Sequence, residues 1–280
     1  MKHKLRFVAL MIGLVLSGTM LVRAQSYQGY VRQALDALAV DSLERAEILF
    51  REAMRLKPAE KANALLFDHI GQIQERQGRY EDALASYTLG VNLSPHTLGI
   101  LLHRGMLLLR QGQLDRALSD FSSMIDLNPD HQRALLFRAY IYVEKRLYKE
   151  ARRDYEHLVK VNPMHEDGLL GLALLNDKDN RPREAMDMMN RLVSMNPERA
   201  DFYAVRAGME HQRRLYEQAE YDFERAISLD PKNPEYYISR AMFYKDFKKK
   251  AKAEADLKSA LALGADPELV AGLLHQWSRE

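Results

Sequence analysis

The sequence predicts an all-α fold built from stacked helical hairpins. Apolar residues recur with helical spacing along the chain, and no segment alternates apolar and polar residues as a half-buried strand does. Prolines follow short apolar stretches, separated first by 37 residues and then four times by 34, at Pro58, Pro95, Pro129, Pro163, Pro197 and Pro231. Such a fixed separation indicates a repeated unit that buries its apolar surface by stacking on its neighbours.

The first 24 residues have the organisation of a secretory signal peptide. Lys2, Lys4 and Arg6 form a basic start, an uncharged and mostly apolar run of 16 residues follows, and Ala24 ends a small-residue cleavage site. The alternative is an uncleaved membrane anchor, but this run is shorter than the roughly 20 residues that a membrane-spanning helix needs. We therefore expect export to the periplasm or the medium, with cleavage near Ala24.

Composition and charge narrow the classes of function. The 280-residue chain is 47% hydrophobic, which is enough for a folded protein. The signal contains four of the 41 Lys and Arg residues and none of the 39 Asp and Glu residues, so the remaining chain has a formal charge of −2. With this net charge, the chain as a whole has no electrostatic attraction for nucleic acid. Because the chain has no cysteine, disulfides and thiolate sites are excluded.

Self-comparison aligns seven units, which begin near residues 27, 64, 98, 132, 166, 200 and 234. The eighth residue of each unit is Gly or Ala, the twentieth is always Ala, and Gly78 and Gly112 fall at the turn between two expected helices. The twenty-fourth residue is large and apolar in each unit: Phe50, Tyr87, Phe121, Tyr155, Met189, Phe223 and Leu257. Small residues where two helices cross allow close approach, and the large residue fills the space beside the crossing. Each unit is therefore expected to be an antiparallel helix pair that ends at the proline.

This pattern resembles the tetratricopeptide repeat family from residue 27 to about residue 265. The resemblance implies a right-handed α-solenoid of seven helix-turn-helix repeats, which together span residues 25–265. The last unit has Ala265 in place of the proline, and Asp266 and Pro267 then open a further helix. We expect residues 266–280 to form a capping helix that covers the end of the stack. Its expected buried side consists of Leu269, Leu273, Leu274 and Trp277.

The seventh and twenty-third residues of the units vary together. Four units have Arg at the seventh position and Asp at the twenty-third, and the other three units have neither. The sequence therefore predicts ion pairs between the two helices of one hairpin: Arg104 with Asp120, Arg138 with Asp154, Arg206 with Asp222, and Arg240 with Asp256. A half-buried pair with two hydrogen bonds would fix the alignment of the two helices.

The resemblance also implies where a ligand would bind. In this family the first helix of each repeat lines a concave groove, and the equivalent residues here are mostly apolar: Leu102, Met106, Leu109, Leu136, Tyr140, Val143, Leu170, Leu174, Ala204, Gly208, His211 and Met242. Ala204 and Gly208 are the smallest, so a dent is expected between Leu174 and Met242. An apolar strip of this size is typical of a binding surface for a segment with Leu, Phe or Met anchors. The alternatives are packing within the array and association with a second copy.

The sequence contains few features that would indicate catalysis or metal binding. The nine histidines are scattered, and His69 and His103, which share one repeat position, are expected about 10 Å apart, too far for one metal ion. No phosphate-binding loop, metalloprotease motif or nucleophile elbow occurs. The sequence therefore predicts no cofactor, no metal site and no enzyme activity. Lys248, Lys249 and Lys250 are expected at a solvated turn, with an anionic membrane surface or an acidic partner as the alternative contact.

Together these features predict an exported, non-enzymatic scaffold that holds a peptide or a partner protein in an apolar concave groove and has no small-molecule substrate. The alternative is a structural subunit of a cell-envelope complex that uses the convex face or the ends of the array. A repeat array determines how binding occurs and not which partner binds.

Overall fold

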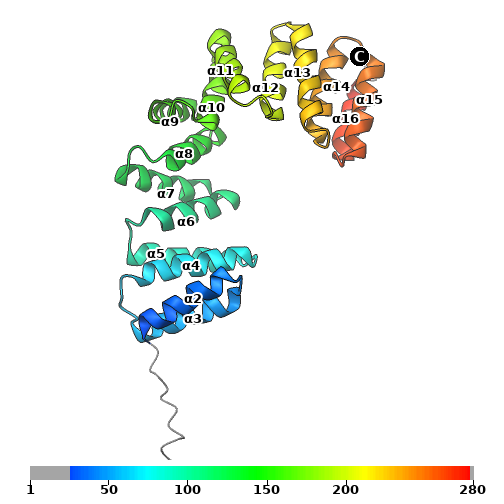
Figure 1. Ribbon diagram of the computed structural model, residues 1–280. Helices are drawn as coiled ribbons and strands as arrows, with labels where there is room; N and C mark the ends of the chain where they lie inside the picture. The colour runs from blue at the N-terminus through cyan, green and yellow to red at the C-terminus, as the bar shows by residue number, and fades with distance from the viewer. Residues whose placement is uncertain (1–25, 278–280) are drawn as a thin grey trace, which may run out of the picture. The chain divides into compact units, whose positions relative to one another are not determined.

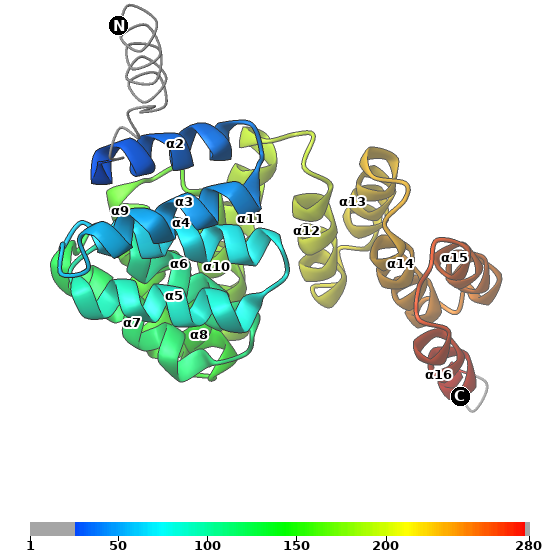
Figure 2. The same ribbon diagram turned by 90° about the horizontal axis from the view of Figure 1, so that it is seen from below.

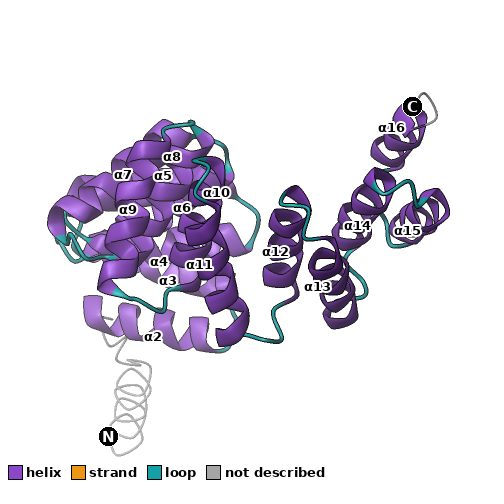
Figure 3. Cartoon of the chain, turned by 90° about the horizontal axis from the view of Figure 1, so that it is seen from above, coloured by secondary structure: helices purple, strands orange, loops and turns teal. Residues whose placement is uncertain are grey.

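A computed structural model describes residues 26–277, so the predicted signal segment 1–24 lies outside the described residues. Every regular element in this range is an α-helix, as Figure 3 shows. The helices form two compact units, one that ends at Pro129 and one that begins at Asp130 (Figure 1). The prediction of an all-α repeat fold is confirmed.

The N-terminal unit consists of three helical hairpins, and the C-terminal unit consists of four hairpins and a final helix. Within each hairpin the two helices contact each other more extensively than either contacts any other helix. The helices of the N-terminal unit are α2 (Tyr27–Ala39), α3 (Leu43–Leu56), α4 (Asn63–Arg76), α5 (Tyr80–Leu93), α6 (Leu98–Arg110) and α7 (Leu114–Leu127).

The hairpins of the C-terminal unit are numbered on from these. Its helices are α8 (Gln132–Glu144), α9 (Tyr148–Val161), α10 (Glu166–Lys178), α11 (Pro182–Met195), α12 (Ala200–Gln212), α13 (Tyr216–Leu229), α14 (Pro234–Asp246), α15 (Lys250–Ala262) and α16 (Pro267–Trp277). None of the described helices has the length and apolar character that crossing a membrane requires.

Each hairpin turns through one residue in the left-handed backbone region, always the fifteenth residue of the repeat. Gly78 and Gly112 adopt this conformation, with φ values of 75° and 71°. The other five turns place a residue with a side chain there: Asp41, Arg146, Asn180, Arg214 and Lys248. The next residue donates its N–H to a carbonyl five residues earlier, as Arg79 does to Gln74 at 2.8 Å, which closes the first helix in a Schellman motif. Hairpin packing therefore imposes a conformation that costs a non-glycine residue about 1 kcal/mol.

Close approach of ring and backbone explains the glycines at the eighth position. A Cβ on Gly71 would lie 2.5 Å from the ring of Tyr87, and a Cβ on Gly105 would lie 2.9 Å from the ring of Phe121. Both rings are fully buried and belong to the twenty-fourth residue of the same repeat. The second helix thus fills the space that the small residue leaves on the first helix.

Helix α16 packs on the last hairpin, as Figure 2 shows. Val270 is its most buried side chain, and Leu273 and Trp277 are partly buried against the same core. These three residues are spaced by three and four positions, so they share one helix face. The prediction that Leu269 and Leu274 also lie on the buried face is wrong, because both flank that face and are exposed.

Candidate functional site

The C-terminal unit presents a row of half-exposed apolar side chains on the first helices of its hairpins. Tyr140 on α8, Leu174 on α10 and Met242 on α14 are each the ninth residue of their repeat, with exposed fractions of 47%, 48% and 50%. Gly208 on α12 is the ninth residue of the intervening repeat, and a Cβ built there would have no atom within 4 Å. We call these four residues the ninth-residue row. The row is apolar and accessible. At Gly208 no side chain fills the row, and this is where the sequence predicts a dent.

The other predicted groove residues of this unit are only partly buried: Leu136, Val143, Leu170, Ala204 and His211. Leu136 and Val143 pack against the core that contains Tyr155, and Leu170 and Ala204 pack against the core that contains Phe202. These residues therefore belong partly to the core and partly to the surface. Tyr140, Leu174 and Met242 in the ninth-residue row are the most exposed of the predicted groove side chains.

An ion pair and a histidine–aspartate contact join neighbouring first helices beside the open position. Arg213, the residue that follows α12, pairs with Asp177 on α10. On the other side, Nε2 of His211 lies 3.2 Å from Oδ2 of Asp246 on α14, and the His211 ring meets the edge of Phe243 at a centroid distance of 5.2 Å. These contacts join α12 to α10 on one side and to α14 on the other.

The N-terminal unit differs from the prediction. Leu102 has only 8% of its surface exposed, and Met106 and Leu109 are partly buried. The assignment of Leu102 to an open groove is therefore corrected: α6 packs against both α4 and α7, which places this side chain in the core.

A polar cluster on the first helices of this unit was missed. Nδ1 of His103 lies 2.8 Å from Oδ1 of the buried Asp68, and Gln72 donates to Oδ2 of Asp68 at 3.0 Å. Asp68 and Gln72 are the fifth and ninth residues of the second repeat. The predicted groove residues were listed from the third repeat onward. Including the same positions of the second repeat would have identified Asp68 and Gln72.

The four Arg–Asp pairs join the two helices within single hairpins. In each pair Nε and Nη2 of the arginine donate to the two carboxylate oxygens at 2.6 to 2.9 Å. All four aspartates are buried, and between 16% and 19% of each arginine side chain is exposed. Each pair therefore joins the two helices of its own hairpin, as the sequence predicted.

Glu210 is a buried carboxyl group beside one of these pairs. Its Oε1 atom lies 4.0 Å from Nε of Arg206, and its side chain is nearly inaccessible. Burial and the charge of Asp222 outweigh the opposing effect of Arg206 and raise the pKa of Glu210 to about 7. Two other repeats have neutral amides at the same position, Gln74 and Asn176. Nothing in the sequence pattern distinguishes this Glu from a solvated one.

Part of the lysine run is engaged by another hairpin. Lys249 and Lys252 lie 3.1 and 3.0 Å from the carboxylate of Glu220 on α13. Burial opposes ionisation of Glu220, but hydrogen bonds from Lys252, Tyr244 and Lys249 outweigh it and lower the pKa of Glu220 to about 2.

Within residues 26–277, His, Asp and Glu side chains do not gather in groups of three that would suit a metal ion.

These observations define an α-helical repeat protein built from two-helix hairpins, with an accessible apolar row on its first helices. The chain belongs to the tetratricopeptide repeat family. Family models with this description match residues 66–97, 102–160 and 170–234, which together make up more than half of the chain. No curated protein matches the chain.

Solved structures share this fold. A tetratricopeptide repeat protein from Parabacteroides merdae superimposes with a TM-score of 0.74 at 28% identity, over 91% of this chain and 100% of that protein. PilF from Pseudomonas aeruginosa matches with a TM-score of 0.62 at 13% identity, over 79% of this chain and 100% of that one. The tetratricopeptide protein YrrB matches with a TM-score of 0.50 at 19% identity, over 68% of this chain and 97% of that one. The last two identities are low, so these matches support the fold alone.

Proposed function

We propose that the chain is an exported scaffold that binds an extended segment of a partner protein along the ninth-residue row. Tetratricopeptide proteins generally mediate protein–protein interactions and are typically not enzymes, so the class of function follows from the family. The proposed location of the binding site rests on the half exposure of Tyr140, Leu174 and Met242. The open space at Gly208 supports the same location. An accessible apolar row of this kind is typical of an interaction surface.

The spacing of the row suggests the conformation of the bound segment. Packed helices lie about 8–10 Å apart, so equivalent residues on α12 and α14, which contact each other directly, recur at about that distance. A polyproline II segment rises about 3.1 Å per residue and brings every third side chain to the same face, a period of about 9 Å. We therefore expect partner segments with apolar residues at every third position. The side chain opposite Gly208 would be the largest of them.

Two further observations support parts of this proposal. The solved structure of YrrB is described as having an unusual peptide-binding site, which makes peptide binding the first activity to test, although no residue is transferred at 19% identity. Export is supported by the basic start, apolar run and Ala24 cleavage site in the first 24 residues. N-terminal sequencing of the mature chain should begin at Gln25, and retention of Met1 would contradict cleavage.

Site-specific photo-crosslinking in cells tests the location of the partner. A photoreactive amino acid is placed at Leu174, in the row, and at Tyr221, a control on the second helix α13 with 65% of its surface exposed. We expect a protein adduct from position 174 and none from position 221, because only the first is on the binding face. Adducts from position 221 with none from position 174 would exclude the row.

A structural subunit that uses its second helices is the second candidate function. It is favoured by a cavity of about 820 Å³ in the N-terminal unit, whose lining includes Leu84, Arg116 and Leu89, which is 49% exposed. A cavity of this size is large enough to receive side chains of a partner. A third crosslinking position at Leu89 separates the two functions, because only the subunit function predicts an adduct there.

A further inference from the structure

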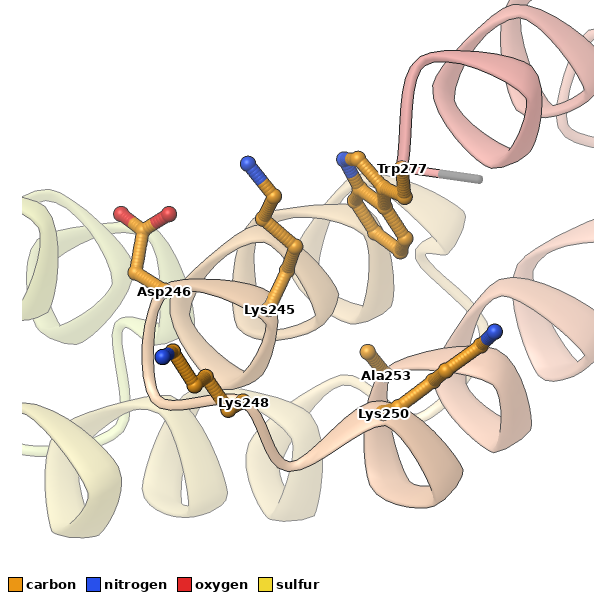
Figure 4. Close-up of a pocket in the computed structure, with 6 residues that line it drawn as sticks. All are labelled: Lys245, Asp246, Lys248, Lys250, Ala253 and Trp277. Carbon is orange, nitrogen blue, oxygen red and sulfur yellow. The ribbon is translucent and has the colours of Figure 1, made fainter. Parts of the chain in front are cut away.

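We propose that a pocket at the end of the last hairpin binds an acidic peptide segment. The pocket has a volume of about 570 Å³ and is lined by Lys245, Asp246, Lys248, Lys250, Ala253 and Trp277 (Figure 4). These residues come from the end of α14, the turn to α15, the first turn of α15 and the end of α16. None of them belongs to the ninth-residue row, so this site is independent of the proposed function.

The floor and one wall of the pocket are apolar and held in place. Ala253 is fully buried, and Trp277 packs with Tyr237 and Phe247 against the core of the last two hairpins. Figure 4 shows the indole ring of Trp277 beside the alkyl chain of Lys245, with Ala253 below the ring. An indole offers a flat apolar surface and one N–H donor. The pocket can therefore enclose an apolar side chain that lies next to a charged group.

The rim of the pocket is positively charged. Among the described residues, Lys248 and Lys250 line it beside one carboxylate, that of Asp246, which is within 3.2 Å of His211. Lys250 is 3.8 Å from Glu254, but both side chains are at least half exposed, and such a pair contributes little. Lys249 and Lys252 do not line the pocket and are held by Glu220.

The first turn of α15 adds to this charge. Helix α15 has no acidic residue in its first turn, whereas the second helix of every other hairpin has one: Glu44, Glu81, Asp115, Glu150, Glu184 and Glu217. The carboxylate that the other six hairpins provide is thus missing beside this pocket. Carboxylates of a partner would complement the lysines on the rim.

The shape of the site favours a peptide over a membrane surface. Membrane-surface segments insert protruding apolar side chains between lipids. Here the apolar groups are recessed, since Ala253 is buried and Trp277 is packed against the core. A volume of this size is typical of pockets that enclose a ligand group. A peptide with one apolar residue among several Glu or Asp residues has the matching shape and charge.

The single tryptophan of the chain makes the site directly observable. The chain from Gln25 is titrated with a nine-residue peptide that has Phe at its centre and Glu elsewhere, and the fluorescence of Trp277 is recorded. We expect a saturable change that weakens as salt is added. Replacing Lys248→Glu together with Lys250→Glu should weaken binding about tenfold, because two attractions become repulsions.

Matched controls separate the pocket from net charge. Lys149→Glu with Lys160→Glu makes the same charge change on exposed positions of α9 and should leave the affinity unchanged. A peptide with Lys in place of Glu should not bind. The proposal is overturned if both double variants bind alike, if the Lys peptide binds equally, or if vesicles of phosphatidylglycerol change Trp277 fluorescence and the Glu peptide does not. Crosslinking at Leu174 reports on the ninth-residue row separately.

Discussion

Replacing Asp154 by alanine is expected to lower the free energy of unfolding by about 3 kcal/mol. Asp154 is buried and accepts two hydrogen bonds from Arg138, at 2.7 Å each. Only 19% of the Arg138 side chain is exposed, so the variant would leave a largely buried charge without the carboxylate of Asp154. Breaking such a pair from one side costs about 3–5 kcal/mol. The loss is measured as a lower urea concentration at the midpoint of unfolding. The slope of the free energy of unfolding against urea concentration should stay unchanged.

The fifth repeat provides the control for this prediction. It has Leu172 and Met188 at the two positions, so the hairpin also forms with an apolar pair. The double variant Arg138→Leu with Asp154→Met should lie within about 1 kcal/mol of the wild type, because no charge is left buried. If the double variant were as unstable as Asp154→Ala, the loss would come from packing and not from removing the carboxylate beside Arg138.

Replacing Glu210 by glutamine is expected to stabilise the protein above pH 7 and to have little effect at pH 5. The pKa of Glu210 is about 7 in the folded protein, against an ordinary value of 4.5. The folded state therefore keeps a proton that the unfolded state releases, and stability falls as pH rises from about 4.5 to about 7. The loss amounts to at most about 3 kcal/mol. Glutamine avoids it because it stays neutral.

Urea midpoints at pH 5 and pH 8 test this sign. The gap between Glu210→Gln and the wild type should open between the two pH values, with the variant more stable at pH 8. Glu144→Gln serves as the control, because Glu144 is exposed. Parallel pH profiles for wild type and Glu210→Gln would show that Glu210 ionises in the folded protein as it does in the unfolded chain.

Repetition explains how much of the fold could be predicted from the sequence. The chain contains seven copies of one pattern, and comparing them identified three features. These are the small residues at the eighth position, the large residues at the twenty-fourth and the four Arg–Asp pairs. The tight contact between Gly71 and Tyr87 is the physical basis of the first two. The left-handed turns at Arg146, Arg214 and Lys248 were not predicted, because only glycine marks such a conformation in a sequence.

Contacts between repeats explain what could not be predicted. His103 with Asp68 and Arg213 with Asp177 join residues that lie 35 and 36 positions apart, and helix packing brings them together without any shared local pattern. Packing of α6 on two neighbouring helices likewise decides that Leu102 is buried. In the candidate site, Gly208 predicted the gap because its lack of a side chain is visible in the sequence. The degree of exposure of Tyr140 and Leu174 required the structure.

Filling the open position of the ninth-residue row tests the central claim most directly. Peptides selected from a random display library against the wild-type chain are measured for binding to Gly208→Phe and Gly208→Ala. Since a Cβ at this position meets no atom within 4 Å, alanine should stabilise helix α12 by about 0.5–1 kcal/mol, and the Cβ of phenylalanine has the same room. We predict that Gly208→Phe lowers affinity at least about tenfold, a change of ~1.4 kcal/mol, while Gly208→Ala retains it. Wild-type affinity in Gly208→Phe would show that the partner segment does not use the row.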